Sequence, residues 1–454
     1  MTVLTPDLCV IGAGSGGLSV AAGAVQMGAS VVLIERGAMG GDCLNTGCVP
    51  SKALLHAGAA GRDWTEAHDH VRATIERIAP HDSVERFEGL GVTVLQGSAQ
   101  FTGPDRVAVG ETTVQARRFV VATGSQPAVP EIPGLAALPY LTNETIFDLP
   151  ERPRHLLVLG AGPIGIEMAQ AHRRLGCAVT VIEAASPLGR EDADAAALVV
   201  AALDAEGVRI LENTAVTQAR PHPDGIALDT SAGEIAGTHL LVATGRRPSI
   251  ATLGLDKAGV ETGPGGIVTD AGLRTTNRRV YAIGDVTGGA QFTHVAGYQA
   301  GLVVRSALFG LPARARTDHI PRAIYTSPEL AQVGLTEAEA RARHGSTLDV
   351  ITAEVAANDR AAASGRDSGF LKVMVVRGRP VGATLVGEDA GEQIAFWALA
   401  LAARLKMSAI AGTVLPYPTV AELSKRAAGA YFSPRLFGNL WVKRVVRAVQ
   451  RFVP

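Results

Sequence analysis

The segment GGDCLNTGCVPSK, residues 40–52, places two cysteines close together in a chain that has only four. A closed zinc site needs four ligands. Cys9 and Cys177, the other two cysteines, lie in apolar runs that predict core strands, so a zinc site is excluded. A structural disulfide between Cys43 and Cys48 would close a very short loop and would constrain the unfolded chain little. The sequence therefore predicts a redox-active cysteine pair.

Two glycine-rich segments indicate the elements around this pair. Residues 10–35 and residues 158–183 each have the pattern of a strand, a tight glycine turn, a helix and a second strand. In both segments the same number of positions separates the first glycine from the closing acid, Glu35 or Glu183. Such glycines let a turn approach a pyrophosphate, the helix N-terminus offers free N–H groups, and the acid accepts from a ribose hydroxyl. Each segment therefore predicts one bound dinucleotide, through Gly12, Gly14 and Gly17 and through Gly160, Gly162 and Gly165.

The alternative for both segments is that their glycines are ordinary turn residues and that Glu35 and Glu183 are solvated strand ends. If Glu183 does face a ribose, its carboxylate repels the 2′-phosphate of NADPH, and no arginine follows it closely. The sequence therefore predicts NADH over NADPH, with Arg190 as the one nearby residue that could fold back onto a phosphate.

Composition limits the partners and the compartment. Lys and Arg together number 42, and Asp and Glu number 43, so no overall field attracts nucleic acid and a small-molecule partner is expected. No apolar run reaches the ~18 residues of a membrane-spanning helix, and residues 1–7 lack the basic start of a secretion signal. Four cysteines without such a signal fit a reducing compartment, so we expect a cytoplasmic protein.

Further short motifs lead to a family resemblance. VVATGSQP at 120–127 and LVATGRRP at 241–248 each end an apolar strand in a small-residue turn. YAIGDVTGG at 281–289 ends in Asp285, which either accepts from a polyol such as ribityl or caps the next helix. With GGDCLNTGCVPSK, the glycine-rich segments and a late YPTVAE, these motifs resemble the pyridine nucleotide-disulfide oxidoreductases over essentially the whole chain. Within that family the sequence is most similar to dihydrolipoamide dehydrogenases and mercuric reductases.

The resemblance implies an α/β fold with two Rossmann-like dinucleotide-binding domains, for FAD and NAD, and a C-terminal α+β dimerisation domain. It places the first part of the FAD-binding domain at 1–149, the NAD-binding domain at 150–270, the return segment of the FAD or central domain at 271–318, and the dimerisation domain at 319–454. It also implies a homodimer. The residues implied for FAD are Gly12, Gly14, Gly17, Glu35, Lys52, Ala99, Thr123, Gly124 and Asp285, and those implied for NAD are Gly160, Gly162, Gly165, Glu183 and Gly245.

The resemblance also gives the cysteine pair its chemistry. Electrons would pass from NADH through the flavin to a Cys43–Cys48 disulfide, with Cys48 nearest the flavin and an accessible Cys43 exchanging with substrate. A helix after Cys48 favours its thiolate through the helix dipole, and Lys52 adds a cation. A lowered thiol pKa is what exchange requires. Lys52 is expected to pair with Glu167, although two unrelated surface charges are the alternative.

The sequence departs from the family pattern at LPYPTVAE, residues 415–422. Tyr417 stands where the thiol reductases usually have histidine, in a run whose glutamate corresponds to Glu422. A phenol titrates near ~10 and an imidazole near ~6.5, so Tyr417 is a poor base at neutral pH. If Glu422 accepts from the phenol, the tyrosine pKa rises further. We therefore expect poor dihydrolipoamide dehydrogenase activity, with both residues facing the partner subunit's cysteines.

Three functions stay open. The leading one is an NAD(P)H-dependent flavoprotein disulfide reductase acting on a low-molecular-weight or protein disulfide. Mercuric reductases also have tyrosine at the Tyr417 position, so reduction of a soft metal ion is the second, although no cysteine beyond Cys177 is present to deliver the ion. A flavin-loaded redox sensor, whose dithiol state alters a partner, is the non-enzymatic alternative. No resident metal site is predicted.

The last stretch, residues 434–454, predicts a basic amphipathic helix. Apolar residues recur at helical spacing and basic residues lie between them: Phe437, Leu440, Trp441, Val445 and Val449, with Lys443, Arg444, Arg447 and Arg451. Such a helix either packs on the dimer or rests on an anionic membrane surface.

Overall fold

The computed structural model describes residues 2–453, which form two compact units. The first unit contains the residues up to Ser186 together with Val208–Ala315, and the second contains Pro187–Gly207 and the residues from Arg316 onward. Among residues 2–453, no helix combines the length and the apolar character that crossing a bilayer requires.

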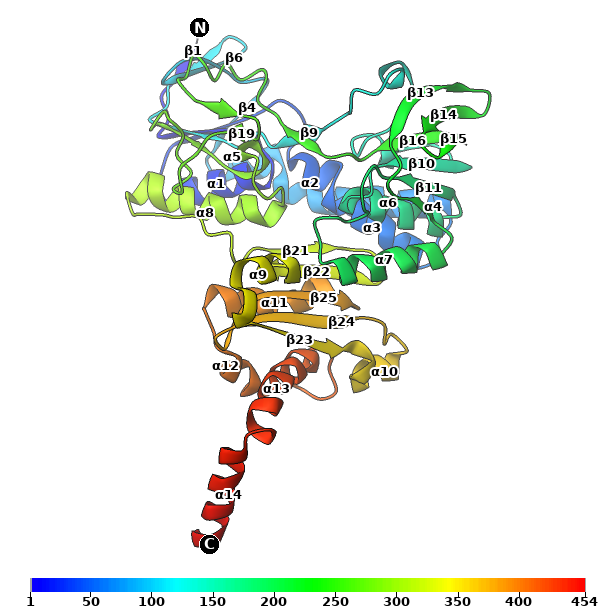
Figure 1. The fold of residues 1–454 in the computed structure, drawn as a ribbon. Coiled ribbons are helices and arrows are strands. Elements are labelled where there is room, and N and C mark those ends of the chain that lie inside the picture. The colour runs from blue at the N-terminus through cyan, green and yellow to red at the C-terminus, as the bar shows by residue number, and fades with distance from the viewer. Residues whose placement is uncertain (1, 454) are drawn as a thin grey trace. The chain divides into compact units, whose positions relative to one another are not determined.

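The first unit contains two parallel sheets with the same local plan (Figure 1). One sheet has the strand order β20-β8-β2-β3-β4. Its strands are β2 Leu8–Ile11, β3 Val31–Glu35, β4 Thr93–Gln96, β8 Arg118–Val121 and β20 Val280–Ala282, all parallel. The runs LCVI and VVLIE are apolar almost throughout, as expected for strands that are covered on both faces. Two helices, α1 (Ser15–Gln26) and α8 (Thr293–Phe309), pack against each other and share a buried core with β2 and β3.

The other parallel sheet has the order β12-β11-β10-β16. Its strands are β10 His155–Leu159, β11 Ala178–Ile182, β12 Arg209–Leu211 and β16 His239–Val242, and α6 (Pro163–Arg174) connects β10 to β11. An antiparallel sheet shares a hydrophobic core with this parallel sheet; its strands are β13 Val216–His222, β14 Gly225–Thr230 and β15 Gly233–Gly237. Both glycine-rich segments therefore form the predicted strand, turn, helix and strand.

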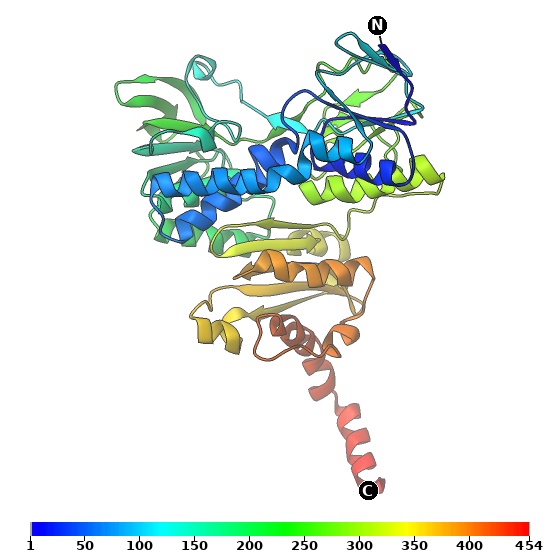
Figure 2. The ribbon, with the colours of Figure 1, turned by 180° about the vertical axis from the view of Figure 1, so that it is seen from behind.

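Four further helices and several short strands complete the α-helices and strands of the first unit. Its remaining helices are α2 Gly41–Asn45, α3 Cys48–Ala59, α4 Trp64–Ile78 and α5 Val84–Gly89. α3 contacts both α4 and α6, and Figure 2 shows α3 and α4 from behind. The short strands β9 Ser125–Pro127 and β17 Arg246–Pro248 pair antiparallel, so the two ATG motifs meet. The other strands are β1 Thr2–Leu4, β5 Gln100–Gly103, β6 Arg106–Val109 and β7 Thr112–Val114 in one sheet, and β18 Thr262–Gly263 with β19 Gly266–Ile267.

The second unit is built on an antiparallel sheet with the order β21-β22-β25-β24-β23. The strands are β21 Pro321–Ile324, β22 Glu329–Gly334, β23 Leu348–Glu354, β24 Phe370–Val376 and β25 Arg379–Gly387. The helices are α7 Ala193–Ala205, α9 Glu337–His344, α10 Asp359–Ser364, α11 Ala390–Ala402, α12 Met407–Ala411, α13 Glu422–Phe437 and α14 Leu440–Phe452. Trp397 of α11 is fully buried in its core and donates to Ser424 of α13. The predicted fold class, with its C-terminal α+β part, is confirmed.

One segment packs differently from the predicted domain ranges. Pro187–Gly207, inside the range 150–270, belongs to the second unit. The reason lies in tertiary contacts: α7 packs on β22 and β25, and the ammonium of the buried Lys372 lies 2.9 Å from Asp192 and 2.6 Å from Asp194. A buried ammonium requires such partners because its desolvation is costly.

Candidate active site

The first and third glycines of each glycine-rich turn are required by close backbone contacts. Gly12 and Gly160 have φ of +102° and +104°, and a Cβ on either would lie 2.5 or 2.6 Å from the carbonyl oxygen of an ATG turn. A Cβ on Gly17 or Gly165 would lie 1.8 or 2.0 Å from the carbonyl oxygen of the first glycine. No other residue fits these positions. The turns are therefore held between the following helix and the adjacent strand.

The middle glycines, Gly14 and Gly162, are not required by a close backbone contact. Their φ values of −78° and −75° suit any residue, and a Cβ on either would meet no described atom within 4 Å. Each precedes a helix N-terminus that has no side-chain cap, so free N–H groups face an open cradle that a side chain would fill. This arrangement fits a diphosphate at each turn.

The closing acids of the two glycine-rich segments, Glu35 and Glu183, make equivalent hydrogen bonds. Glu35 accepts from the backbone N–H of Ala13 at 2.6 Å, and Glu183 accepts from that of Ala161 at 2.8 Å. Their second oxygens accept from Gly37 and Ala185. Both half-buried carboxylates thus lie against the glycine turns, which favours a role at the turn over solvated strand ends, and their contact with a nucleotide ribose stays a prediction.

The other residues implied for cofactor binding lie in the same unit. Thr123 donates to the Ser249 carbonyl at 2.9 Å. Gly124 and Gly245, the last glycines of the two ATG motifs, have φ of +65° and +134° and open space around a built Cβ. Ala99 is buried in the core of the first unit, so only its backbone is available to a ligand.

The cysteine pair lies where α2 meets α3. Cys43 is in α2 and Cys48 begins α3. Neither forms a disulfide in the described chain; Cys48 is exposed and Cys43 is half-buried. Both thiols are therefore at least partly accessible, and the assignment of Cys43 as the thiol that exchanges with substrate stays a prediction.

The two thiols have very different pKa values. A hydrogen bond from Cys43 lowers the pKa of Cys48 to about 6, with further contributions from Thr293 and from the charge of Lys52. The Cys48 sulfur lies 3.5 Å from Thr293 Oγ1. The same Cys43–Cys48 hydrogen bond, aided by burial, raises the pKa of Cys43 far above its usual range. The lowered pKa of Cys48 favours its thiolate at neutral pH, with Lys52 contributing as expected and Cys43 as the main cause.

Lys52 and Glu167 form the predicted pair. The Lys52 ammonium lies 2.7 Å from a carboxylate oxygen of Glu167, which is 4% exposed on α6. The pairing excludes the alternative of two unrelated surface charges. Lys52 favours the Cys48 thiolate and Glu167 opposes it, so the ion pair moderates the effect of the cation.

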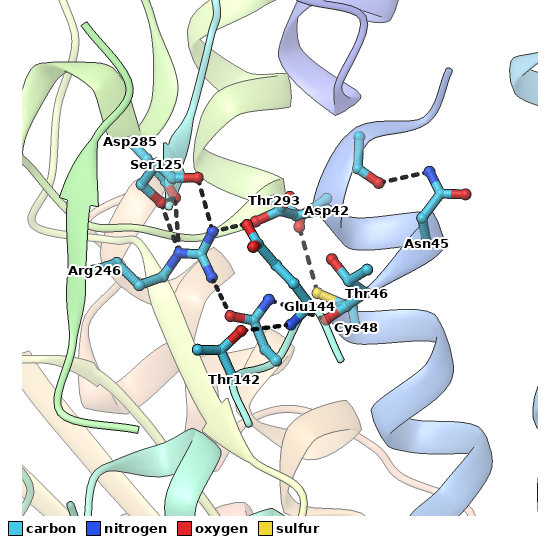
Figure 3. A network of polar contacts seen from close by, with 12 residues as sticks. Asp42, Asn45, Thr46, Cys48, Ser125, Thr142, Glu144, Arg246, Asp285 and Thr293 are labelled. Atoms are coloured by element: carbon cyan, nitrogen blue, oxygen red, sulfur yellow. Dashed lines mark hydrogen bonds and ion pairs between the residues drawn. The ribbon is translucent and has the colours of Figure 1, made fainter. Parts of the chain in front are cut away.

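An arginine outside the predicted site residues organises this region (Figure 3). Arg246 donates to the Ser125 hydroxyl at 2.6 Å and to Asn143 at 3.2 Å, and it forms an ion pair with Asp42, the residue before Cys43. Asn143 in turn donates to the Thr46 carbonyl at 3.1 Å. The segment that carries Cys43 is thus held on both sides, at Asp42 and at Thr46.

Asp285 belongs to the same network. It accepts from Ser125 at 2.6 Å and lies 3.9 Å from Arg246. The sequence contains a signal for this network, because Ser125 and Arg246 directly follow the two ATG turns. The repetition of the ATG motif indicates that the strands after the two turns pair.

Tyr417 and Glu422 lie in the second unit. Tyr417 is 71% exposed and its hydroxyl donates to Asp359 at 3.0 Å. The Asp359 carboxylate raises the pKa of Tyr417, and Glu422 contributes much less. The expected direction is confirmed but the expected hydrogen-bond partner, Glu422, is wrong, because Asp359 at the start of α10 reaches the phenol. One carboxylate oxygen of Glu422 is buried without a hydrogen-bond partner among residues 2–453.

A groove of ≈ 480 Å³ lies along α3 and α4. Its lining includes one reactive thiol, Cys48, a few apolar side chains and several cationic or imidazole groups; the residues are Cys48, Val49, Lys52, Ala53, His56, His70, Thr74, Arg77 and Ile78. No carboxylate is among these described lining residues. Burial, and to a smaller extent the nearby charges of Arg62, His56 and Arg77, lower the pKa of His70.

The chain is similar to known proteins over most of its length. The profile of the pyridine nucleotide-disulphide oxidoreductase family matches residues 6–300, and that of the family's dimerisation domain matches residues 320–428. Mercuric reductases of Bacillus cereus and Streptomyces lividans are 34% and 35% identical, over 93% and 94% of this chain and 70% and 96% of theirs. The copper(II) complex of RclA, an HOCl-induced flavoprotein disulfide reductase from Escherichia coli, is 30% identical with a TM-score of 0.88, covering 94% of this chain and 99% of that one.

Proposed function

This chain belongs to the pyridine nucleotide-disulphide oxidoreductase family, and from that premise we propose that Cys43 and Cys48 are the redox-active dithiol through which it reduces a disulfide acceptor. Family membership makes the protein an NAD(P)H-dependent flavoprotein oxidoreductase that uses FAD and a pyridine nucleotide. The observation that carries the proposal is the Cys48 thiolate, which is stabilised by Cys43 and lies at the N-terminus of α3.

The cofactor assignments extend the same proposal. Bound FAD supplies a two-electron carrier between the nicotinamide and the dithiol. The first glycine turn, Glu35, Lys52, Ala99, Thr123, Gly124 and Asp285 would hold it, and the second turn with Glu183 and Gly245 would hold the nicotinamide nucleotide. The open cradles at Gly14 and Gly162 support both assignments. The domain ranges 1–149, 150–270, 271–318 and 319–454 are part of the proposal.

We propose NADH as the preferred coenzyme. Glu183 is fixed by two backbone N–H groups at the edge of its turn, so its charge is held where the ribose hydroxyls of the nucleotide would lie. A 2′-phosphate at that position meets a carboxylate instead of a cation.

The acceptor step is thiol–disulfide exchange. The dithiol attacks a disulfide RSSR, a mixed disulfide forms and one RSH leaves, and the second cysteine then closes the Cys43–Cys48 disulfide and releases the second RSH. For Cys43 to be the attacking thiol, its proton must pass to another group. The Cys48 thiolate is bonded to it, but with a pKa of about 6 it is a weak acceptor at neutral pH, and Tyr417 is no better. In the reverse direction a thiol of dihydrolipoamide must likewise lose its proton before it attacks the Cys43–Cys48 disulfide. A protonated phenol at position 417 cannot accept that proton, which supports slow turnover of dihydrolipoamide.

The groove along α3 narrows the class of acceptor. Arg77 is cationic, and His56 and His70 add polar imidazoles, without a carboxylate among the described lining residues. Lys52 contributes less positive charge, because its ammonium is paired with Glu167. A disulfide that carries carboxylate groups would complement this lining, whereas a cationic disulfide would be repelled. We therefore propose an anionic disulfide.

A soft metal ion is the second candidate acceptor. Two adjacent thiols favour soft ions, and relatives of this chain include mercuric reductases. A redox sensor is the third, since the same dithiol could report its state to a partner. Multiple turnover of any acceptor argues against the sensor.

We propose a homodimer, in the cytoplasm, with residues 434–454 as a peripheral membrane contact. The match to the family's dimerisation domain supports the dimer. The unpartnered oxygen of Glu422 supports a further contact at this position, and we propose that Glu422 and Tyr417 face the partner subunit's cysteines.

The test of the dithiol proposal is anaerobic titration of the FAD-loaded protein with NADH. A long-wavelength thiolate-to-flavin absorption band is expected in the wild type and should disappear in Cys48→Ser, while Cys177→Ser, which changes a buried cysteine, should keep it. Absence of the band in all three proteins would mean that the cysteines do not communicate with the flavin.

A further inference from the structure

The side chains of α14 do not pack into a hydrophobic core. None of its residues is buried among residues 2–453, and Trp441 and Phe452 are 70% and 79% exposed. Figures 1 and 2 show α14 continuing beyond α13, away from the sheet of the second unit. Asn439 caps it by accepting from the Trp441 N–H at 2.9 Å. An isolated helix of this length is marginal in water, so α14 requires a surface that covers its apolar side.

The side chains of α14 separate into two faces. At 3.6 residues per turn, the basic residues fall within about 100° and the large apolar residues within about 140° on the opposite side. The basic face consists of Lys443, Arg444, Arg447 and Arg451, and the apolar face consists of Trp441, Val442, Val445, Val446, Val449 and Phe452. Leu440, which was expected on the apolar face, falls on the basic side at the start of the helix.

Charge distinguishes among the surfaces that could cover this helix. No Asp or Glu occurs from residue 423 to the end, although the whole chain has a net charge of −1. A helix of a coiled coil usually carries both signs of charge beside a narrow apolar seam. α14 has cations only, and its apolar face is wider than such a seam. These features are those of helices that lie in a membrane interface.

We propose that residues 438–454 bind the surface of an anionic lipid bilayer, with α14 lying in the plane of the interface. The inference rests on the proposed peripheral contact and names its lipid chemistry. Trp441 and Phe452, at the two ends of α14, enter the boundary between headgroups and acyl chains, and the four cations face the phosphates. The reductase would thereby be held at a membrane without a spanning segment.

The experiment is co-sedimentation of the full-length FAD-loaded protein with vesicles of phosphatidylcholine alone or mixed with phosphatidylglycerol. We expect binding to the mixed vesicles only, reversed by high salt. Arg444→Gln with Arg447→Gln should weaken it about 30-fold, from ~1 kcal/mol per cation, whereas Arg444→Lys with Arg447→Lys should preserve it. Trp441→Ser should weaken binding, and Val414→Ser, which changes an 87% exposed residue outside the tail, should not.

The outcomes distinguish the anionic lipid class from the peripheral membrane contact on which it rests. Equal binding to both vesicle types would overturn the anionic lipid class but leave the peripheral contact. Binding to neither would overturn both, and a fall in oligomeric mass on removal of residues 438–454 would then assign α14 to a subunit contact. NADH turnover in solution should be the same with and without the tail, so failure of the reductase proposal would be seen independently.

Discussion

Arg246, the first residue of β17, forms an ion pair with Asp42, the residue immediately before Cys43. The same guanidinium donates to Ser125, whose hydroxyl donates to Asp285. One side chain thus connects the second ATG motif, the first ATG motif and the redox loop. Its position explains how the short helix α2 is fixed at the residue before Cys43.

Arg246→Ala should therefore destabilise the first unit. Arg246 is largely buried, and its loss leaves several acceptors unpaired, so we expect the free energy of unfolding to fall by about 1–3 kcal/mol. Urea denaturation measures this. Arg247→Ala is the matched control, because Arg247 is its exposed neighbour on β17; equal effects of the two substitutions would contradict the role given to Arg246.

The thiolate of Cys48 predicts the pH dependence of alkylation. A lowered thiol pKa means that the thiolate persists above the folded-state value and is lost below it, so the iodoacetamide rate should rise through about pH 6 and then level off. Cys43→Ala removes the largest cause and should move the midpoint upward. Lys52→Met should move it upward less, and Lys52→Arg should leave it nearly unchanged. A wild-type midpoint at the ordinary thiol value of ~8.5 would show that Cys43 does not stabilise the thiolate.

The tyrosine at position 417 predicts a gain of activity. Tyr417→His supplies a base that titrates near neutrality, so we expect turnover with dihydrolipoamide to rise about 10²-fold. Tyr417→Phe removes the phenol without adding a base and should give no gain. Wild-type turnover that rivals dedicated dihydrolipoamide dehydrogenases would refute the argument.

Glu183 predicts the choice of coenzyme. We expect kcat/KM for NADH to exceed that for NADPH, and Glu183→Gln to narrow the ratio by about 10-fold because it removes the repelling charge. Steady-state kinetics with both coenzymes decide it. Glu206→Gln, which changes a glutamate at the end of α7, is the control; stronger use of NADPH by the wild type would contradict the prediction.

The groove along α3 predicts selectivity for the charge of the acceptor. Among disulfides of similar size, we expect kcat/KM to fall from anionic to neutral to cationic compounds. Arg77→Gln should reduce turnover of the anionic one about 5-fold and leave the neutral one unchanged, as expected for one cation of ~1 kcal/mol near a partly exposed charge. Arg72→Gln, on the same helix but outside the groove, serves as control. Turnover of all three without preference would remove the charge argument but keep the reductase.

Local sequence determined the elements of this protein and their chemistry. The glycine turns could be predicted because the third glycine, Gly17 or Gly165, packs on the first glycine of its own turn, so the spacing reflects a local contact. The position of Cys48 at a helix N-terminus follows from the residues after it. The low pKa of Cys48 and its Lys52 neighbour belong to the same local segment. The amphipathic tail was equally visible, because helical periodicity needs no tertiary partner.

Tertiary structure alone decided which side chains meet. Arg246 reaches Asp42 and Asp359 reaches Tyr417 across long separations in the chain, and no local pattern encodes such pairs. The same holds for the exposure of Cys48 over Cys43, which depends on how α2 packs, and for Pro187–Gly207, which joins the second unit through Asp192 and Lys372. Hydrogen bonds and ion pairs act over a few ångströms in space, whereas a sequence motif records only distance along the chain.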